Sequence, residues 1–580
     1  MNNKGVAIRY GDVAPEAKEN FKPTSDSAKF DTLAQLQQYN LNFPNYANPC
    51  ELYSVVLDGT ATAFPSMLEQ ANLGLWSEQI SNDDGTFTDP IVLTLTSNGQ
   101  YSSQGLTLTF DTYNGIYPTL INIKWFRDAD GTLTELSNMD FAPDNAFYFC
   151  RNQVKNYNRV VITLYSLNMP KNRLKLRVID YGYGTFFYGD ELRGVKLIQE
   201  IDPISTQISI NTADFTLDSK TDIEYSFQAK QPLSVYFNGE LKATTFVKKS
   251  TRKAKRLWSI QSEDYIGLLD SIPYYGGIYT NKNAVELLTD IFTVAKIPYN
   301  IDDVFAGATV SGYIPFTTCR DALMQVAFGI QAVVDTCNSE VVKVFALEED
   351  VKQTIPLNRI MQGQNFADEE TVTGVEVAVH SYKPITEIVD VYDANESGTG
   401  QNIFVKFSEP LHDLSITNGT ITQSHTNYAV INANAGCILR GQQYEHTTQT
   451  RRKNNPVVLA SEIEKVVAID NATLVSQYNI DNIIDKCYNW LIKTNTTNLK
   501  IVEGKHIQYG EPYKYGTGLK YGTGLKYGGR YPNIVAYDEK VNVGENIKAE
   551  TEYLGIVGGR LIKQSFNLNG NIIVKEAVLK

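Results

Sequence analysis

Aromatic side chains supply the most evident candidate binding chemistry in this sequence. Trp76 and Tyr101 precede or lie in expected turns, and Tyr113 belongs to the same aromatic-rich region. An exposed aromatic ring can pack against the apolar face of a sugar. Trp125 alternates with the isoleucines of its expected strand, and this alternation predicts a buried ring. We therefore take Trp76, Tyr101 and Tyr113 as candidate glycan-binding residues and Trp125 as a core residue.

Sequence patterns that would identify a catalytic or metal centre are absent. There is no GxSxG, no GxGxxG after a strand, no GxxxxGK[ST] and no HExxH. The five histidines lack zinc-ligand spacing, and the six cysteines include no CxxC pair. Acidic runs at Asp83-Asp84 and Glu348-Glu349-Asp350 stand in turn-like sequence, where solvated loops are expected rather than a glycosidase carboxylate pair. We therefore predict no enzymatic activity, no metal site and no cofactor.

A cluster of basic residues contrasts with the acidic composition of the chain. The formal net charge is -13 and the pI is about 5.1, which argues against general binding to a nucleic-acid backbone. The cluster lies on and after an expected strand and comprises Lys242, Lys248, Lys249, Arg252, Lys253, Lys255 and Arg256. Lysines on a hairpin edge discourage unwanted strand pairing, or they meet an acidic neighbour. Lys248, Lys249, Arg252 and Lys253 are thus candidate subunit contacts.

A short internal repeat places tyrosines at a fixed interval. The segment 514–531 repeats Lys-Tyr-Gly in two and a half copies, with Tyr515, Tyr521 and Tyr527 six residues apart. An even period puts these side chains on one side of an extended chain. The repeat is either a surface loop or a tyrosine-lined loop that docks on a partner subunit.

The elements that would position these residues form several domains. An extended lead-in covers residues 1–50, and short alternating strands with turn signals over 51–182 predict an antiparallel sandwich or jelly roll. Strands over 195–282 predict a first β-barrel, and two amphipathic helices with a closing hairpin predict a small α/β domain over 283–366. The pattern over the remainder, 367–580, predicts a second β-barrel. It contains a helix at 471–494 and the Tyr/Gly loop at 508–532. The expected fold is mainly β and multidomain.

The sequence also bounds where the protein is made. The N-terminus lacks an apolar run of signal-peptide length, and nowhere do 18 apolar residues follow one another. We expect a protein that is made in the cytoplasm, with no membrane span and with reduced, structural cysteines.

Several segments resemble a known family of structural proteins. The resemblance is to baseplate hub or tail-tip proteins of tailed phages and phage-tail-like bacteriocins of Gram-positive, clostridia-like bacteria. It extends over nearly the whole chain. The segments that carry it are Tyr10–Lys18, Asn42–Glu51, Leu75–Ser77, Leu167–Gly182 and Gly558–Gly570.

This resemblance implies a fold and a function. Residues 51–182 would be a galactose-binding-like, discoidin-type jelly roll, and the two barrels would be hub-type domains that form a ring as a trimer. The protein would then be a symmetry adaptor in the baseplate, made in the host bacterium, that joins the tail tube to the spike and the baseplate wedge proteins. The alternative is a receptor-binding baseplate subunit that holds a host cell-wall glycan in its jelly roll. A third hypothesis is a glycosidase that degrades the cell wall.

Overall fold

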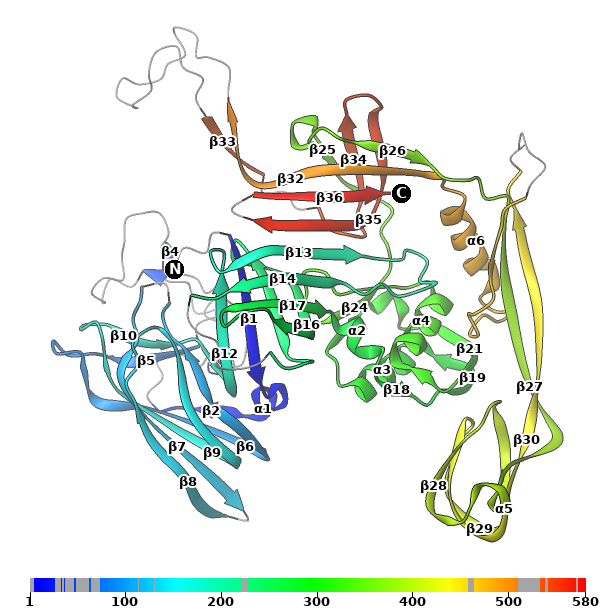
Figure 1. Cartoon of the computed structure of the whole chain (residues 1–580), viewed down its shortest axis with the longest axis horizontal. Coiled ribbons are helices and arrows are strands. Elements are labelled where there is room, and N and C mark those ends of the chain that lie inside the picture. The colour runs from blue at the N-terminus through cyan, green and yellow to red at the C-terminus, as the bar shows by residue number, and fades with distance from the viewer. Residues whose placement is uncertain are drawn as a thin grey trace. The chain divides into compact units, whose positions relative to one another are not determined.

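The computed structural model describes most of the chain. The described residues are 5–26, 33, 36, 46–47, 62–63, 74–112, 114–129, 131–220, 227–456, 464–509, 532–537, 541–569 and 572–580. They form two compact units, residues 1–188 with 224–240 and residues 189–223 with 241–580, and each unit is described by itself. Strands predominate in both (Figure 1). This confirms the predicted mainly β, multidomain fold.

The first unit is built around an antiparallel sheet with the strand order β11-β6-β9-β7-β8, in which β2 pairs with β6. Its strands are β2 (Lys22–Thr24), β6 (Thr86–Thr109), β7 (Pro118–Ala129), β8 (Thr132–Phe141), β9 (Phe147–Leu167) and β11 (Val178–Asp180). A separate pair joins β5 (Leu75–Ile80) to β10 (Arg173–Leu176). Alternate residues of β7 turn inward, so Ile121, Ile123 and Trp125 are buried. Trp125 is the core residue that its alternation predicts.

A buried ion cluster holds the N-terminal strand of this unit. Strand β1 (Val6–Val13) pairs antiparallel with β12 (Gly182–Tyr188) on one side and with β15 (Pro232–Phe237) on the other, and α1 (Pro15–Asn20) follows it. The buried carboxylate of Asp180 accepts hydrogen bonds from Arg9 and, at 3.0 Å, from the Nζ of Lys18. Burial alone would raise the pKa of Asp180, but the two cations outweigh burial and lower it. The cluster ties β1 and α1 to the segment that enters β12.

The second unit has a long sheet in which strands far apart in sequence are neighbours. Its order is β16-β17-β14-β13-β35-β36-β32-β26. These strands are β13 (Leu192–Glu200), β14 (Thr212–Asp218), β16 (Glu240–Arg252), β17 (Leu257–Glu263), β26 (Asn365–Asp368), β32 (Asn495–Tyr509), β35 (Gly555–Asn569) and β36 (Ile572–Leu579). Beside them, β34 (Asn546–Thr551) pairs with β35 and with β25 (Val351–Ile355), and β33 (Pro532–Tyr537) pairs with β32.

The predicted helices of the small α/β region are confirmed. Helix α3 (Ala284–Ala295) begins at Asn283, whose side chain accepts from the backbone N–H groups of the first turn, and α4 (Cys319–Ile330) begins at the capping Thr318. Helix α2 (Tyr265–Leu269) lies beside them (Figure 1), and buried residues of all three helices belong to one hydrophobic core. The accompanying strands are β18 (Pro273–Tyr274), β19 (Gly277–Asn283), β20 (Tyr299–Ile301), β21 (Thr309–Ile314), β22 (Thr317–Thr318), β23 (Val333–Asp335) and β24 (Val342–Phe345).

Two long antiparallel strands form the centre of a separate sheet in the second unit. Strand β27 (Gly374–Asp393) pairs antiparallel with β30 (Tyr428–Asn454) along most of its length (Figure 1). The sheet is completed by β28 (Gly400–Lys406), β29 (Leu411–Ser424) and β31 (Val466–Ile469), with the short helix α5 (Ala394–Ser397) between β27 and β28. Helix α6 (Ile480–Leu491) packs on β27 and β30. No helix among the described residues is long and apolar enough to cross a membrane.

Two features differ from the sequence-based organisation. Strand β13 pairs with β35, so that Leu197 lies opposite Phe566, although the sequence places them in separate barrels. Strand edges pair with whichever edge the tertiary fold leaves open, and sequence distance does not decide this. In addition, α6 is shorter than the predicted helix over 471–494. The backbone N–H of Ser476 donates to the Asn479 side chain in a turn before α6, and this turn delays the start of the helix.

Candidate functional site

The predicted basic cluster lies on the β16–β17 hairpin. The register shifts between Val247 and Lys249, a bulge that leaves Lys248 as the extra residue. A bulge lets two consecutive side chains face solvent, and both Lys248 and Lys249 are exposed. The turn closes where the Lys253 N–H donates to the Leu257 carbonyl at 2.8 Å. The result is a set of six exposed cations, which we call the basic hairpin. They are Lys248, Lys249, Arg252, Lys253, Lys255 and Arg256.

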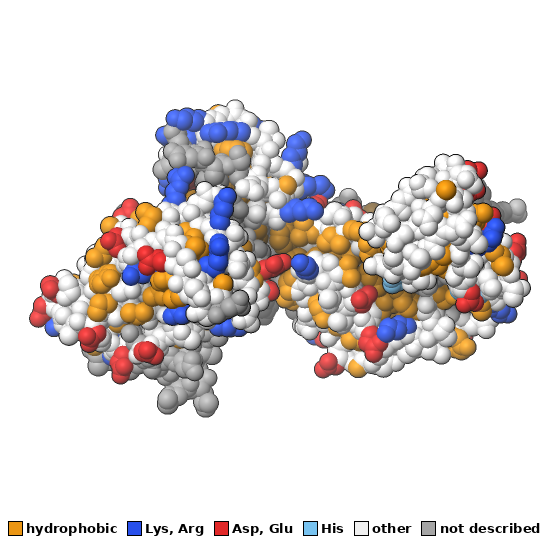
Figure 2. Space-filling view, turned by 90° about the horizontal axis from the view of Figure 1, so that it is seen from below, with side chains coloured by type: hydrophobic (Ala, Val, Ile, Leu, Met, Phe, Trp, Pro, Cys, Tyr) orange, Lys and Arg blue, Asp and Glu red, His pale blue; other side chains and the backbone are white. Residues whose placement is uncertain are grey.

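Local contacts order part of the basic hairpin. The Nζ of Lys248 lies 2.6 Å from a carboxylate oxygen of Glu263. The Arg252 guanidinium lies over the Trp258 ring at 5.2 Å and donates to the Lys255 carbonyl at 2.8 Å. Lys253 makes no ion pair with any described residue. In Figure 2, Lys and Arg side chains gather in the upper left part of the face that is drawn and are sparser on the rest of that face.

The glycan-binding residues predicted in the first unit are not presented to solvent as expected. Trp76 is only 2% exposed, because it lies in strand β5 opposite Lys175, whose ammonium stands 4.6 Å over the ring. Tyr101 is half-buried against Phe21, and its hydroxyl accepts a hydrogen bond from Asn20 at 2.7 Å. The ring of Trp76 is therefore buried in this structure, and its role in glycan binding stays a prediction. Tyr113 lies outside the described residues, as do Tyr515, Tyr521 and Tyr527 of the repeat.

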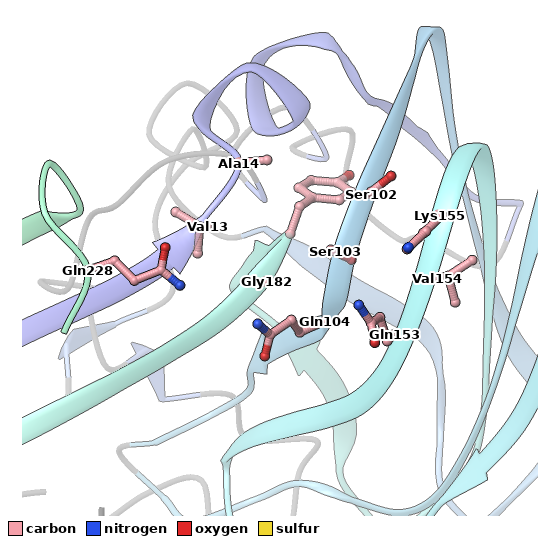
Figure 3. A pocket seen from close by; sticks show the side chains of 11 residues that line it. Val13, Ala14, Ser102, Ser103, Gln104, Gln153, Val154, Lys155, Gly182 and Gln228 are labelled. Carbon is pink, nitrogen blue, oxygen red and sulfur yellow. The ribbon is translucent and has the colours of Figure 1, made fainter. Parts of the chain in front are cut away.

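A polar cavity of about 290 Å³ lies elsewhere in the first unit. Its walls come from the end of β1, from β6, β9 and the start of β12, and from Gln228. Figure 3 shows the carboxamides of Gln104 and Gln153 on one side and that of Gln228 on the other. The lining residues are Val13, Ala14, Ser102, Ser103, Gln104, Gln153, Val154, Lys155, Tyr181, Gly182 and Gln228.

The cavity offers mostly uncharged hydrogen-bonding groups. The Ser103 hydroxyl contacts the Tyr157 hydroxyl at 2.9 Å, and the backbone N–H of Asn156 donates to the Ser102 hydroxyl at 3.0 Å. Burial raises the pKa of Tyr181 well above its ordinary value, which keeps this phenol neutral. Three carboxamides and one lysine complete a set that can exchange hydrogen bonds with a neutral, hydroxyl-rich ligand. The sequence gives no signal for this cavity, because its residues come from distant segments.

Two titratable groups elsewhere, Asp264 and His380, make contacts within the fold. Among the described residues, no three His, Cys, Asp or Glu side chains are placed to hold a metal ion. Burial raises the pKa of Asp264 to about 7, but its carboxylate caps α2 and accepts from the Asn211 N–H and the Thr336 hydroxyl. The Nδ1 of His380 lies 2.9 Å from the Nε2 of His446. In the sequence, Asp264 could be recognised only as a helix cap, because it stands directly before an apolar helical run.

Comparisons with known proteins give weak structural likenesses. No family model matches the chain, and no curated protein matches it. Among solved structures, the tail protein from Neisseria meningitidis MC58 is 9% identical with a TM-score of 0.39, over 68% of this chain and 93% of that chain. The 43 kDa tail protein of prophage MuSo2 from Shewanella oneidensis is 8% identical with a TM-score of 0.38, over 68% and 94%. The prophage tail protein gp18 from Listeria monocytogenes EGD-e is 10% identical with a TM-score of 0.36, over 68% and 91%.

Proposed function

We propose that this protein is a structural, non-enzymatic component of a phage tail or phage-tail-like particle, acting in the baseplate as a hub or tail-tip subunit. It would join the tail tube to the spike and the surrounding baseplate as an oligomeric symmetry adaptor, with the trimer as the expected state. The observation that carries the proposal is the basic hairpin, which concentrates six exposed cations on a chain of net charge -13. The sequence resemblance of Tyr10–Lys18 and Gly558–Gly570 to hub proteins supports a phage tail or phage-tail-like particle as the assembly.

The basic hairpin suits an assembly contact better than a reactive site. An exposed hairpin with positive charge steers an acidic partner and fixes its orientation. Lys248, Lys249, Arg252 and Lys253 are the proposed contact residues. The tyrosine repeat is a second proposed contact, in which the flat, amphipathic side chains of Tyr515, Tyr521 and Tyr527 would supply interface area.

Two measurements test the proposal: the oligomeric state of the purified chain and the position of the protein in the particle. Light scattering on the purified chain should give the mass of three 64.9 kDa chains, and electron microscopy of particles should place the protein at the baseplate with three-fold symmetry. A chain that stays monomeric at high concentration and does not enter particles would contradict the proposal.

The polar cavity of the first unit favours a second candidate function, the binding of a host cell-wall glycan by a receptor-facing subunit. Its support is the set of neutral donors and acceptors around a space of about 290 Å³, since sugars present hydroxyl groups of both kinds. In a cell-wall pull-down with the full chain, Gln104→Ala/Gln153→Ala should abolish binding. The matched control Gln79→Ala/Gln423→Ala should retain it. Equal binding by both variants would rule out this cavity as the glycan site.

A further inference from the structure

The tip of the β34–β35 hairpin exposes large apolar side chains at a turn. Tyr553 is 84% exposed, Leu554 50% and Ile556 64%. The backbone N–H of Leu357 donates to the Glu550 carboxylate at 3.1 Å, and the apolar side chain of Leu357 is also exposed. Exposed aromatic and aliphatic side chains that cluster on a surface mark interaction sites. We call Leu357, Glu550, Glu552, Tyr553, Leu554 and Ile556 the apolar tip.

The turn that presents these side chains is ordered by its own hydrogen bonds. The Thr551 hydroxyl donates to the Gly555 carbonyl at 2.8 Å and accepts from the Leu554 N–H at 3.1 Å. Residues that are already fixed lose little conformational entropy on binding. The turn that carries the apolar tip is therefore already ordered before a partner binds.

The charges of the apolar tip complement those of the basic hairpin. Residues 549–559 contain two glutamates and no Lys or Arg, whereas residues 248–256 contain six cations and no acid. Glu552 is exposed and makes no ion pair with a described residue. The acidic run at 348–350 is a weaker counterpart, because Glu348 already pairs with Lys352 and Glu349 with Arg560 at 2.8 Å.

We propose that the apolar tip of one copy receives the basic hairpin of a second copy of this chain. The inference rests on the proposed oligomer and names its contact surfaces. Because the two surfaces are different, the contact is head-to-tail, and copies joined in this way close into a ring when the rotation between them permits. The exposed glutamates would pair with the hairpin cations at the rim, and Tyr553, Leu554 and Ile556 would form the apolar centre.

A charge swap tests this contact in the full-length chain. Sedimentation velocity over a concentration series gives the dissociation constant between copies. Lys249→Glu/Lys253→Glu and, separately, Glu550→Lys/Glu552→Lys should each raise that constant by about tenfold or more. The chain carrying all four changes should return to within a few-fold of the unchanged protein. Tyr553→Ser/Leu554→Ser, which alters only exposed side chains, should weaken association without charge reversal.

The controls separate this inference from the proposed function. Lys22→Glu/Lys383→Glu removes two lysines outside both surfaces and should leave association unchanged, and circular dichroism checks that each variant is folded. An oligomer that is insensitive to both charge reversals, or that the combined swap does not restore, overturns the contact while the oligomer itself stands. An unchanged protein that is monomeric throughout overturns the oligomer and the contact together.

Discussion

Replacing Asp180 by Asn should loosen the wall of the polar cavity. The carboxylate is fully buried and is shared by Arg9 and Lys18, whose side chains are only 7% and 5% exposed. Removing one partner from a buried ion pair costs about 3–5 kcal/mol, since the remaining charge stays desolvated. At about 1.4 kcal/mol per tenfold change, this corresponds to a rise in local opening of roughly 100-fold to several thousand-fold.

Hydrogen exchange measured by mass spectrometry on the full chain reports this opening directly. Amides of β1 and β12 should lose about 10²-fold protection or more in Asp180→Asn. Lys18→Met should have a smaller effect, because it leaves the contact between Arg9 and Asp180. The matched control is Asp190→Asn, which makes the same chemical change in an exposed pair with Lys220 and should leave protection unchanged.

The pH dependence provides a second readout of the same contact. The pKa of Asp180 lies below its ordinary value of 3.8. The carboxylate therefore stabilises the fold above that value, and this contribution is lost as the pH falls through the lowered folded-state pKa. Equal protection in Asp180→Asn and Asp190→Asn, with no difference in their acid sensitivity, would refute the reasoning.

Three further predictions concern the second unit. Burial and the neighbouring His446 lower the pKa of His380, so the paired strands β27 and β30 around His380 should lose hydrogen-exchange protection as the pH falls below about 6.5, and unchanged protection at pH 5 would contradict this. Gly312→Ala should lower the melting temperature, since a Cβ there would lie 2.2 Å from the Thr473 carbonyl oxygen at a φ of +146°; a gain in stability would contradict the close approach. Burial raises the pKa of the Cys319 thiol to about 11 and of the Cys487 thiol to about 12, so both should resist iodoacetamide until the chain is unfolded, and rapid labelling of the native protein would count against their burial.

Short-range signals in the sequence determined much of the local structure. The capping residues Asn283 and Thr318 begin helices where the sequence predicts, because a cap acts on N–H groups only two or three residues away. Asn238 and Gly239, between β15 and β16, have positive φ angles of 51° and 82°, as is typical of an Asn-Gly pair in a tight hairpin turn. The alternation around Trp125 likewise determined its burial, since a strand turns successive side chains to opposite faces. The cations of the basic hairpin were recognisable because all six lie within residues 248–256.

Only the tertiary structure decided which distant segments meet. Trp76 looked like a turn residue available to a sugar, but pairing of β5 with β10 buries it against Lys175. Gln104, Gln153 and Gln228 line one cavity although no sequence pattern connects them. The exposure of Tyr553 depends on which strand edges β34 and β35 occupy. Such placements follow from long-range strand pairing, in which hydrogen bonds between backbones carry little sequence information, and from the burial that this pairing produces.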